Sequence, residues 1–148
     1  MNHGTVDAAI AVGQLEIRFL IESEDSDGSL TMFECFVPAG AKVPAPHSHD
    51  AFEETIYGLE GVSTWTIDGE TVELSAGEAV CVTRGAVHGF ANQLDADARF
   101  LAIATPGVFG ADYFRELSEV LARFSEGPPD PAAIAAVMLR HGLSPAQS

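Results

Sequence analysis

The stretch EETIYGLEGVSTWTIDGETVELS, residues 53–75, predicts consecutive β-strands. Its three short runs are rich in β-branched and aromatic residues, and they are separated only by Gly61 and by the pair Asp68-Gly69. An Asp-Gly pair between two strand-like runs is a strong signal for a two-residue hairpin turn. Short strands joined by such tight turns are typical of β-sandwiches and β-barrels.

The same texture continues on both sides of this stretch. Strand-like runs occur at 14–21 and 29–37 before it, and at 78–85, 87–92 and 98–107 after it. Glycine-containing turns separate the runs at short intervals. The sequence therefore predicts an all-β body over residues 14–107.

The pattern changes near residue 110. Residues 111–124 carry apolar side chains on one face of a helix, and Asp130-Pro131 forms a good start for a second helix that ends at Gly142. We therefore expect an N-terminal arm or tail at 1–13, the β body at 14–107 and a two-helix C-terminal appendage at 108–148. The helices would pack on the outside of the β body or form a dimer contact.

Length and charge narrow the functions to be considered. The 148 residues suit a single domain, and 22 acidic residues against 7 basic ones give a formal charge of −15. Such a chain is repelled by phosphate backbones and anionic membranes, so we expect neither nucleic acid nor membrane as a partner. No apolar run approaches 18 residues and the N-terminus does not resemble a secretory signal, so we expect a cytoplasmic protein. The two cysteines, Cys35 and Cys81, are expected to be buried, reduced thiols.

The stretch HSHDAFEE, residues 47–54, suggests a metal site. Residues i and i+2 of a strand face the same side, so His47 and His49 present both imidazoles to one surface. Glu54 and Glu53 have opposite parity, which directs Glu54 inward and Glu53 away. With His88 from a separate strand, three imidazoles and one carboxylate would suit Fe, Mn, Ni, Co or Zn. The alternative is a set of histidines satisfied at the surface or in the core without metal.

Two ordered motifs resemble those of the cupin family. The first cupin motif, G-x5-HxH-x3/4-E-x6-G, is matched by a set with one extra residue after its first glycine: Gly40, His47, His49, Glu54 and Gly61. The second, G-x5-PxG-x2-H-x3-N, is matched with Thr83 in place of the proline: Gly77, Gly85, His88 and Asn92. The departures concern a loop length and a turn proline, and no ligand position is affected.

The resemblance implies a single jelly-roll cupin barrel that binds one divalent transition metal through His47, His49, Glu54 and His88. The layout is similar to that of small bacterial cupins related to quercetin dioxygenases. It implies a metal-dependent dioxygenase for a small aromatic or enolisable substrate, with Glu54 as both ligand and base. Two alternatives remain: an oxygen-independent isomerase, cyclase or lyase, and a cupin that binds a small ligand without turnover.

Five further residues are candidates for a substrate pocket, although the aromatic ones could equally be core and the arginine could be solvated. We also expect a homodimer, because the edges of a jelly roll need cover and two-fold dimers are the commonest assembly. The pocket candidates are Phe36, Ile56, Trp65, Arg84 and Phe90.

Overall fold

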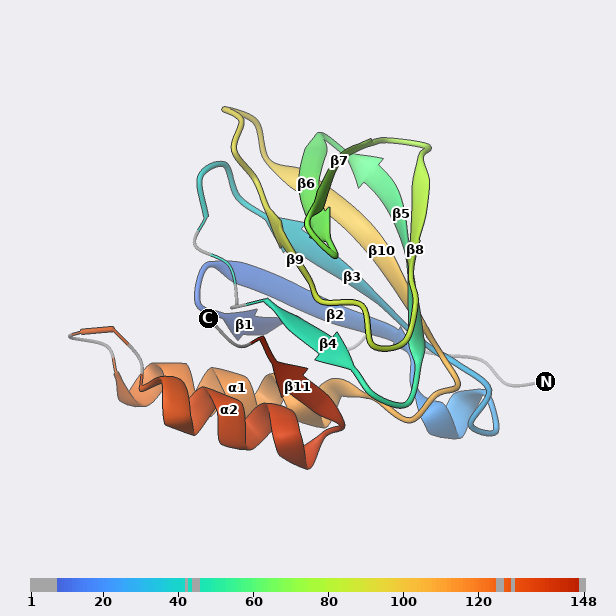
Figure 1. Ribbon diagram of the computed structural model, residues 1–148, viewed down its shortest axis with the longest axis vertical. Coiled ribbons are helices and arrows are strands. Elements are labelled where there is room, and N and C mark those ends of the chain that lie inside the picture. The colour runs from blue at the N-terminus through green and yellow to red at the C-terminus, as the bar shows by residue number, and fades with distance from the viewer. Residues whose placement is uncertain (1–7, 42, 44–45, 125–126, 129, 147–148) are drawn as a thin grey trace.

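Two antiparallel β-sheets packed face to face make up the body of the protein (Figure 1). The computed structural model describes residues 8–41, 43, 46–124, 127–128 and 130–146. One sheet has the order β1-β2-β3-β10-β5-β8, with β1 (Ile10–Val12), β2 (Leu15–Ile21), β3 (Thr31–Val37), β10 (Ala98–Thr105), β5 (Glu53–Glu60) and β8 (Ala79–Val82). The other has the order β11-β4-β9-β6-β7, with β11 (Leu143–Pro145), β4 (His47–His49), β9 (His88–Ala91), β6 (Val62–Ile67) and β7 (Glu70–Ser75). This double-sheet jelly roll with two C-terminal helices confirms the predicted fold class, although the sheets do not close into a barrel.

Alternation along the strands builds the core between the sheets. In β3, every second residue from Thr31 to Val37 is buried, and β10 alternates in the same way from Ala98 to Ala104. The two strands pair antiparallel, so their inward side chains pack on one face. This apolar layer surrounds the place where the histidines meet.

The turns around the central strands follow the predicted chemistry. Asp68 and Gly69 join β6 to β7, and both have positive φ, +47° and +83°. Such a turn matches the twist of a tight hairpin. Gly61 joins β5 to β6 with φ +62°, and a Cβ there would collide with the carbonyl of Asp97. These positions fix where β5, which carries Glu54, turns back.

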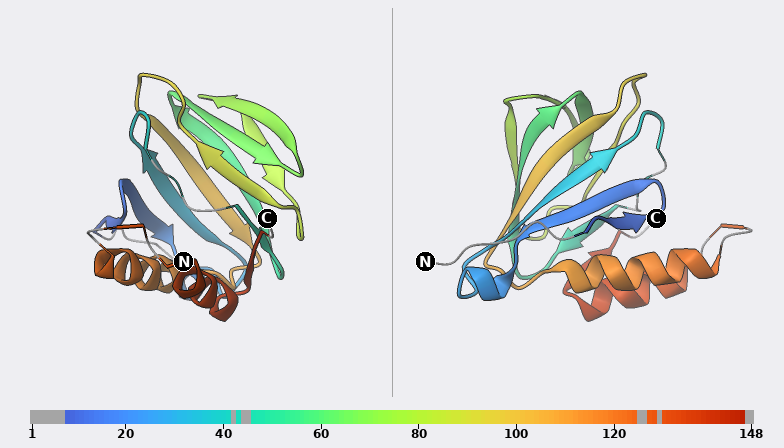
Figure 2. Two further views of the ribbon diagram at one scale, coloured as in Figure 1. Left: turned by 60° about the vertical axis from the view of Figure 1, so that its left-hand side comes forward. Right: turned by 180° about the vertical axis from the view of Figure 1, so that it is seen from behind.

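The C-terminal segment packs on the sheets through its helices and also adds a strand to one of them. Helix α1 (Ala111–Arg123) contacts β1 and α2 (Pro131–Arg140), and Figure 2 shows the two helices side by side beneath the sheets. The Asp130 side chain caps α2 by accepting a hydrogen bond from the backbone N–H of Ala132, as predicted. After α2 the chain adds β11 to the edge of the second sheet, beside β4. Among the described residues, no helix is long and apolar enough to cross a membrane.

Two short strands lie outside the predicted β body. β1 falls within the segment expected as an arm, whose first seven residues lie outside the described part, and β11 falls within the helical appendage. Each has only three residues, which is too short for a period of two to show in the sequence. Pairing with β2 and β4 defines them instead.

The prediction of two buried thiols was half wrong. Cys35 is buried on the inward face of β3, whereas Cys81 is exposed. Cys81 lies on β8, the edge strand of the first sheet, and its neighbour Val82 takes the inward position. A strand with one face toward solvent exposes every second residue, and a continuous apolar run does not show which of its residues face outward.

Candidate metal centre

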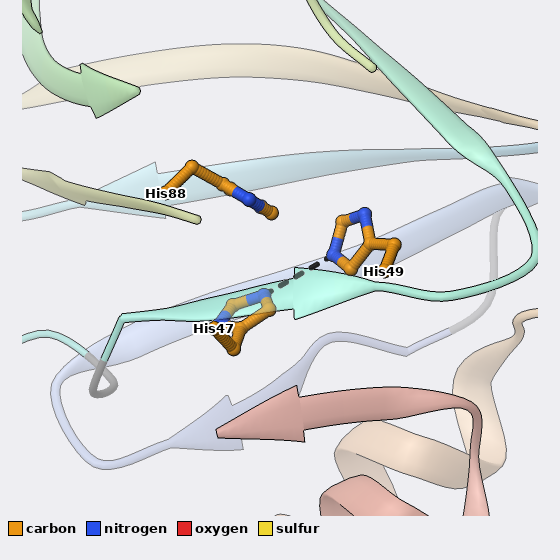
Figure 3. A group of neighbouring side chains, drawn as sticks. All are labelled: His47, His49 and His88. Atoms are coloured by element: carbon orange, nitrogen blue, oxygen red, sulfur yellow. Dashed lines mark hydrogen bonds between the residues drawn. The ribbon is translucent and has the colours of Figure 1, made fainter. Parts of the chain in front are cut away.

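Three imidazoles converge between the two sheets. His47 and His49 come from β4, and His88 begins β9 and pairs directly with His47. Figure 3 shows the three rings turned toward one another, and one ligand atom from each lies within 4.8 Å of the others. His49 and His88 are buried, and His47 is half-buried. The pairing of β4 with β9 therefore brings together two motifs that are far apart in the sequence.

The surroundings of His49 and His88 favour the neutral imidazole, which is the form that binds metal ions. Burial, reinforced by His88 and His47, lowers the pKa of His49 to about 2. Burial also lowers the pKa of His88. The Nδ1–H of His88 donates to the carbonyl oxygen of Ala86 at 3.0 Å, which leaves Nε2 with a free lone pair. A ligand histidine is typically oriented by such a hydrogen bond from its other nitrogen.

The donor set fits a transition-metal ion. The Nε2 atoms of His47 and His49 lie 3.2 Å apart. Two nitrogens that bind one ion at about 2.1 Å are separated by roughly 3.0–3.4 Å, depending on the coordination geometry. Three imidazole ligands suit several divalent ions, so the residues could hold a metal without selecting one.

Glu54 lies at the edge of this group. Its side chain is buried, and its Oε2 is 3.9 Å from Nε2 of His49. The carboxylate is not among the ligand atoms that lie within 4.8 Å of one another, which come from the histidines alone. Desolvation raises the pKa of Glu54 to about 7. The role of Glu54 as a ligand stays a prediction, and its inward direction agrees with strand parity.

Glu53 points the other way. Its carboxylate accepts hydrogen bonds from Nε and Nη2 of Arg84 at 2.9 and 3.1 Å, and both side chains are solvent-accessible. These hydrogen bonds lower the pKa of Glu53. The structure therefore engages Arg84, a substrate-pocket candidate, in an ion pair on the outer surface.

A small cavity of about 40 Å³ is lined in part by His47, His49 and Glu54. The neighbour of Glu54 across the sheet is Ala104, which is also buried. Three aromatic residues that the sequence did not single out complete the cavity wall: Phe109, Tyr113 and Phe114. They precede α1 or belong to it. Aromatic residues at the start of a helix are usually part of the hydrophobic core, so the sequence gives no signal for a cavity. The packing of α1 against the rest of the fold brings these residues to the cavity.

The remaining pocket candidates divide between the two faces of the sheets. Phe90 lines the cavity, and Trp65 packs against both Phe90 and His88, with ring centroids 5.1 and 6.5 Å away. Ile56 is fully buried on β5. Phe36 lies on the outer face of β3, where the Arg99 guanidinium sits 5.3 Å from its ring centre.

Comparison with known proteins agrees with this geometry. A family model described as a cupin domain matches residues 33–104, which include all three histidines and Glu54. This match and the two-sheet jelly roll both support a cupin-type protein. The flanking strands β1 and β2 extend the matched region on one side, and the C-terminal segment extends it on the other.

One curated relative and several solved structures are similar to this chain. The chain is 28% identical over 120 residues to quercetin 2,3-dioxygenase of Bacillus subtilis (strain 168). The aligned region covers 80% of this chain but only 34% of that protein. The chain thus spans about a third of the length of this curated relative. Among solved structures, a predicted oxalate decarboxylase from Thermotoga maritima has a TM-score of 0.61 at 22% identity, covering 70% of this chain and 93% of that one. KdgF from Halomonas sp. has a TM-score of 0.57 at 20% identity, covering 69% and 86%. At these identities the structural likeness concerns the fold alone.

Proposed function

We propose that this protein is a metal-dependent dioxygenase acting on a small aromatic or enolisable substrate. The observation that carries the proposal is a buried carboxylate, Glu54, beside three converging imidazoles in the region that matches the cupin model. The similarity to a quercetin dioxygenase supports the choice of reaction. His47, His49 and His88, together with Glu54, would hold the ion.

The site residues would have distinct tasks. When bound, a divalent transition metal would supply Lewis-acid stabilisation of a substrate oxyanion. Glu54 would remove the proton from the substrate hydroxyl or enol, because its pKa of about 7 lets it exchange a proton near neutral pH. The aromatic wall formed by Phe109, Tyr113 and Phe114 would keep bulk water away from the carboxylate.

Oxygen uptake tests the proposal directly. Metal-free protein is reconstituted separately with Fe(II), Mn(II), Ni(II), Co(II) and Zn(II), and oxygen is followed with an electrode after addition of quercetin or a panel of smaller enols. We expect uptake matched by substrate loss for at least one ion, and none for His88→Ala. Absence of uptake with every ion and every compound would contradict the proposal. Turnover without oxygen would favour the isomerase, cyclase or lyase alternative, and binding without turnover the ligand-binding one.

We also propose that the protein is a homodimer formed through the outer face of the first sheet. Tyr57 and Leu59 of β5 are exposed there, at 42% and 37% of their surface. Sedimentation velocity tests this: we expect a dimer that Tyr57→Glu dissociates, and a monomeric parent protein would contradict it.

A further inference from the structure

A large apolar groove of about 690 Å³ lies where the β1–β2 hairpin, the two helices and β11 meet. Its volume falls within the range of about 300–1,000 Å³ that is usual for small-molecule sites. None of the 14 described residues that line it is ionisable, although the chain has 22 acidic and 7 basic residues. The lining therefore favours an uncharged, apolar ligand.

The cavity at the histidines is too small for such a ligand. Its volume of about 40 Å³ has room for only a few water molecules. A dry cavity that admits a benzene ring measures about 150 Å³. Only a small reactive end of an aromatic molecule could enter this cavity, so the rest of the molecule needs another place.

The groove lies directly beside the cavity. On β11, Leu143 lines the cavity and Pro145 lines the groove, and two residues along a strand are separated by roughly 7 Å. On α1, Phe114 lines the cavity and Leu117 the groove, about 5 Å farther along the helix axis. The same succession occurs where the groove-lining Pro46 precedes the cavity-lining His47. The two hollows are thus separated by about one layer of side chains.

We propose that this groove is the outer substrate subsite and that it binds the uncharged aromatic body of the substrate. For the oxygen-bearing end to reach the histidines, the side chains between the two hollows, which include Phe114 and Leu143, must move aside. This assignment rests on the proposed function for the reaction, whereas binding in the groove can be measured without any turnover. It makes the C-terminal segment, which lies beyond the matched cupin domain, a determinant of substrate choice.

Two neighbouring alanines of α2 provide a matched test. Ala135 lines the groove, whereas Ala136 is exposed and does not line it. Ala135→Trp should fill part of the groove and Ala136→Trp should not. Ala135→Glu and Ala136→Glu form a second pair, which introduces a charge with a smaller side chain. Circular dichroism and thermal unfolding check that each variant is folded.

Binding is measured on metal-free protein with Nile red, an uncharged aromatic fluorophore. We expect Ala135→Trp and Ala135→Glu to weaken binding at least about tenfold, with both Ala136 variants unchanged. Equal affinity in a folded Ala135 variant and its Ala136 partner would overturn the proposal. So would sedimentation data in which an Ala135 variant dissociates a dimer, because the groove would then be covered by a second copy of the chain.

Turnover separates this inference from the proposed function. If the reconstituted protein consumes oxygen with quercetin, Ala135→Trp should raise KM at least about tenfold while kcat stays within about twofold. An unchanged KM would overturn the subsite and leave the dioxygenase proposal intact. If no compound is turned over but the Ala135 variants lose Nile red, the dioxygenase proposal fails and the groove stands as a binding site.

Discussion

The inner and outer faces of β5 carry the same residue type in opposite environments. Glu54 faces inward, where burial raises the pKa of its carboxyl to about 7. Glu53 faces outward, where hydrogen bonds from Arg84 lower the pKa of its carboxyl. Adjacent positions in one strand thus differ in chemistry because they differ in face. The inner face places a carboxyl of raised pKa 3.9 Å from His49, and the outer face forms an ordinary surface ion pair.

The largest expected effect concerns metal affinity. His88→Ala removes one of three converging imidazoles, and we expect affinity for Co(II) or Zn(II) to fall by more than about 100-fold. The matched control is His141→Ala, because His141 lies at the end of α2 and outside the group of three histidines. Its Nε2 is 3.3 Å from a carboxylate oxygen of Glu116. Equilibrium dialysis with elemental analysis measures both. Equal metal content in His88→Ala and the parent protein would refute the site.

The next effect contrasts the two glutamates in catalysis. Glu54→Gln keeps the shape of the side chain but removes the base, so we expect kcat to fall by about 100-fold. Glu53→Gln loses only the exposed contact with Arg84 and should keep kcat within about twofold. Steady-state oxygen uptake at matched metal content measures both variants. Comparable kcat values for the two would show that the inward carboxylate is not the base.

Thiol labelling tests the same contrast of faces on other strands. Cys81 is exposed, whereas Cys35 is buried, and burial followed by the nearby Glu54 charge raises the pKa of its thiol. With Ellman's reagent, we expect the native protein to react at Cys81 about 50-fold or more faster than at Cys35, which needs the fold to open. Cys81→Ser should remove the fast phase and Cys35→Ser should retain it. A fast phase in Cys81→Ser would contradict the burial of Cys35.

The smallest effect is the pH dependence of stability in metal-free protein. The carboxyl of Glu54 ionises near pH 4.5 when unfolded and near pH 7 when folded. Between these values the unfolded chain has released the proton and the folded protein has kept it, so the contribution of Glu54 to the free energy of unfolding falls as pH rises. Urea unfolding at pH 5 and pH 8 measures this contribution. Between these pH values, the change in the free energy of unfolding should be more favourable in Glu54→Gln than in the parent protein by roughly 1–3 kcal/mol.

Glu53→Gln provides the control of opposite sign. The folded-state pKa of Glu53 is lowered, so this group stabilises the fold above its unfolded pKa and that contribution is lost as pH falls. Below pH 5, the free energy of unfolding of Glu53→Gln should therefore decrease less than that of the parent protein. Between pH 5 and pH 8, the two proteins should show the same change in this free energy. Identical pH profiles for the two glutamine variants would rule out opposite environments.

The sequence determined the strands, the central hairpin and the direction of the inward side chains. Strand parity and tight turns are local properties, so alternation in β3, β5 and β10 and the Asp68-Gly69 turn could be predicted from neighbouring residues. The order of the histidines, read through the cupin motifs, identified the three that meet. The shape of the site could not be predicted in this way.

Tertiary structure decided what surrounds the histidines. The three-residue strands β1 and β11 are defined by their pairing with β2 and β4, and Cys81 is exposed because it lies on the outer face of β8. Phe109, Tyr113 and Phe114 became cavity residues because α1 packs beneath the sheets. These features depend on contacts between segments far apart in the chain, which no local pattern encodes. The sequence therefore identified the histidines of the candidate metal site, and packing of the C-terminal segment determined the size and lining of the cavity beside them.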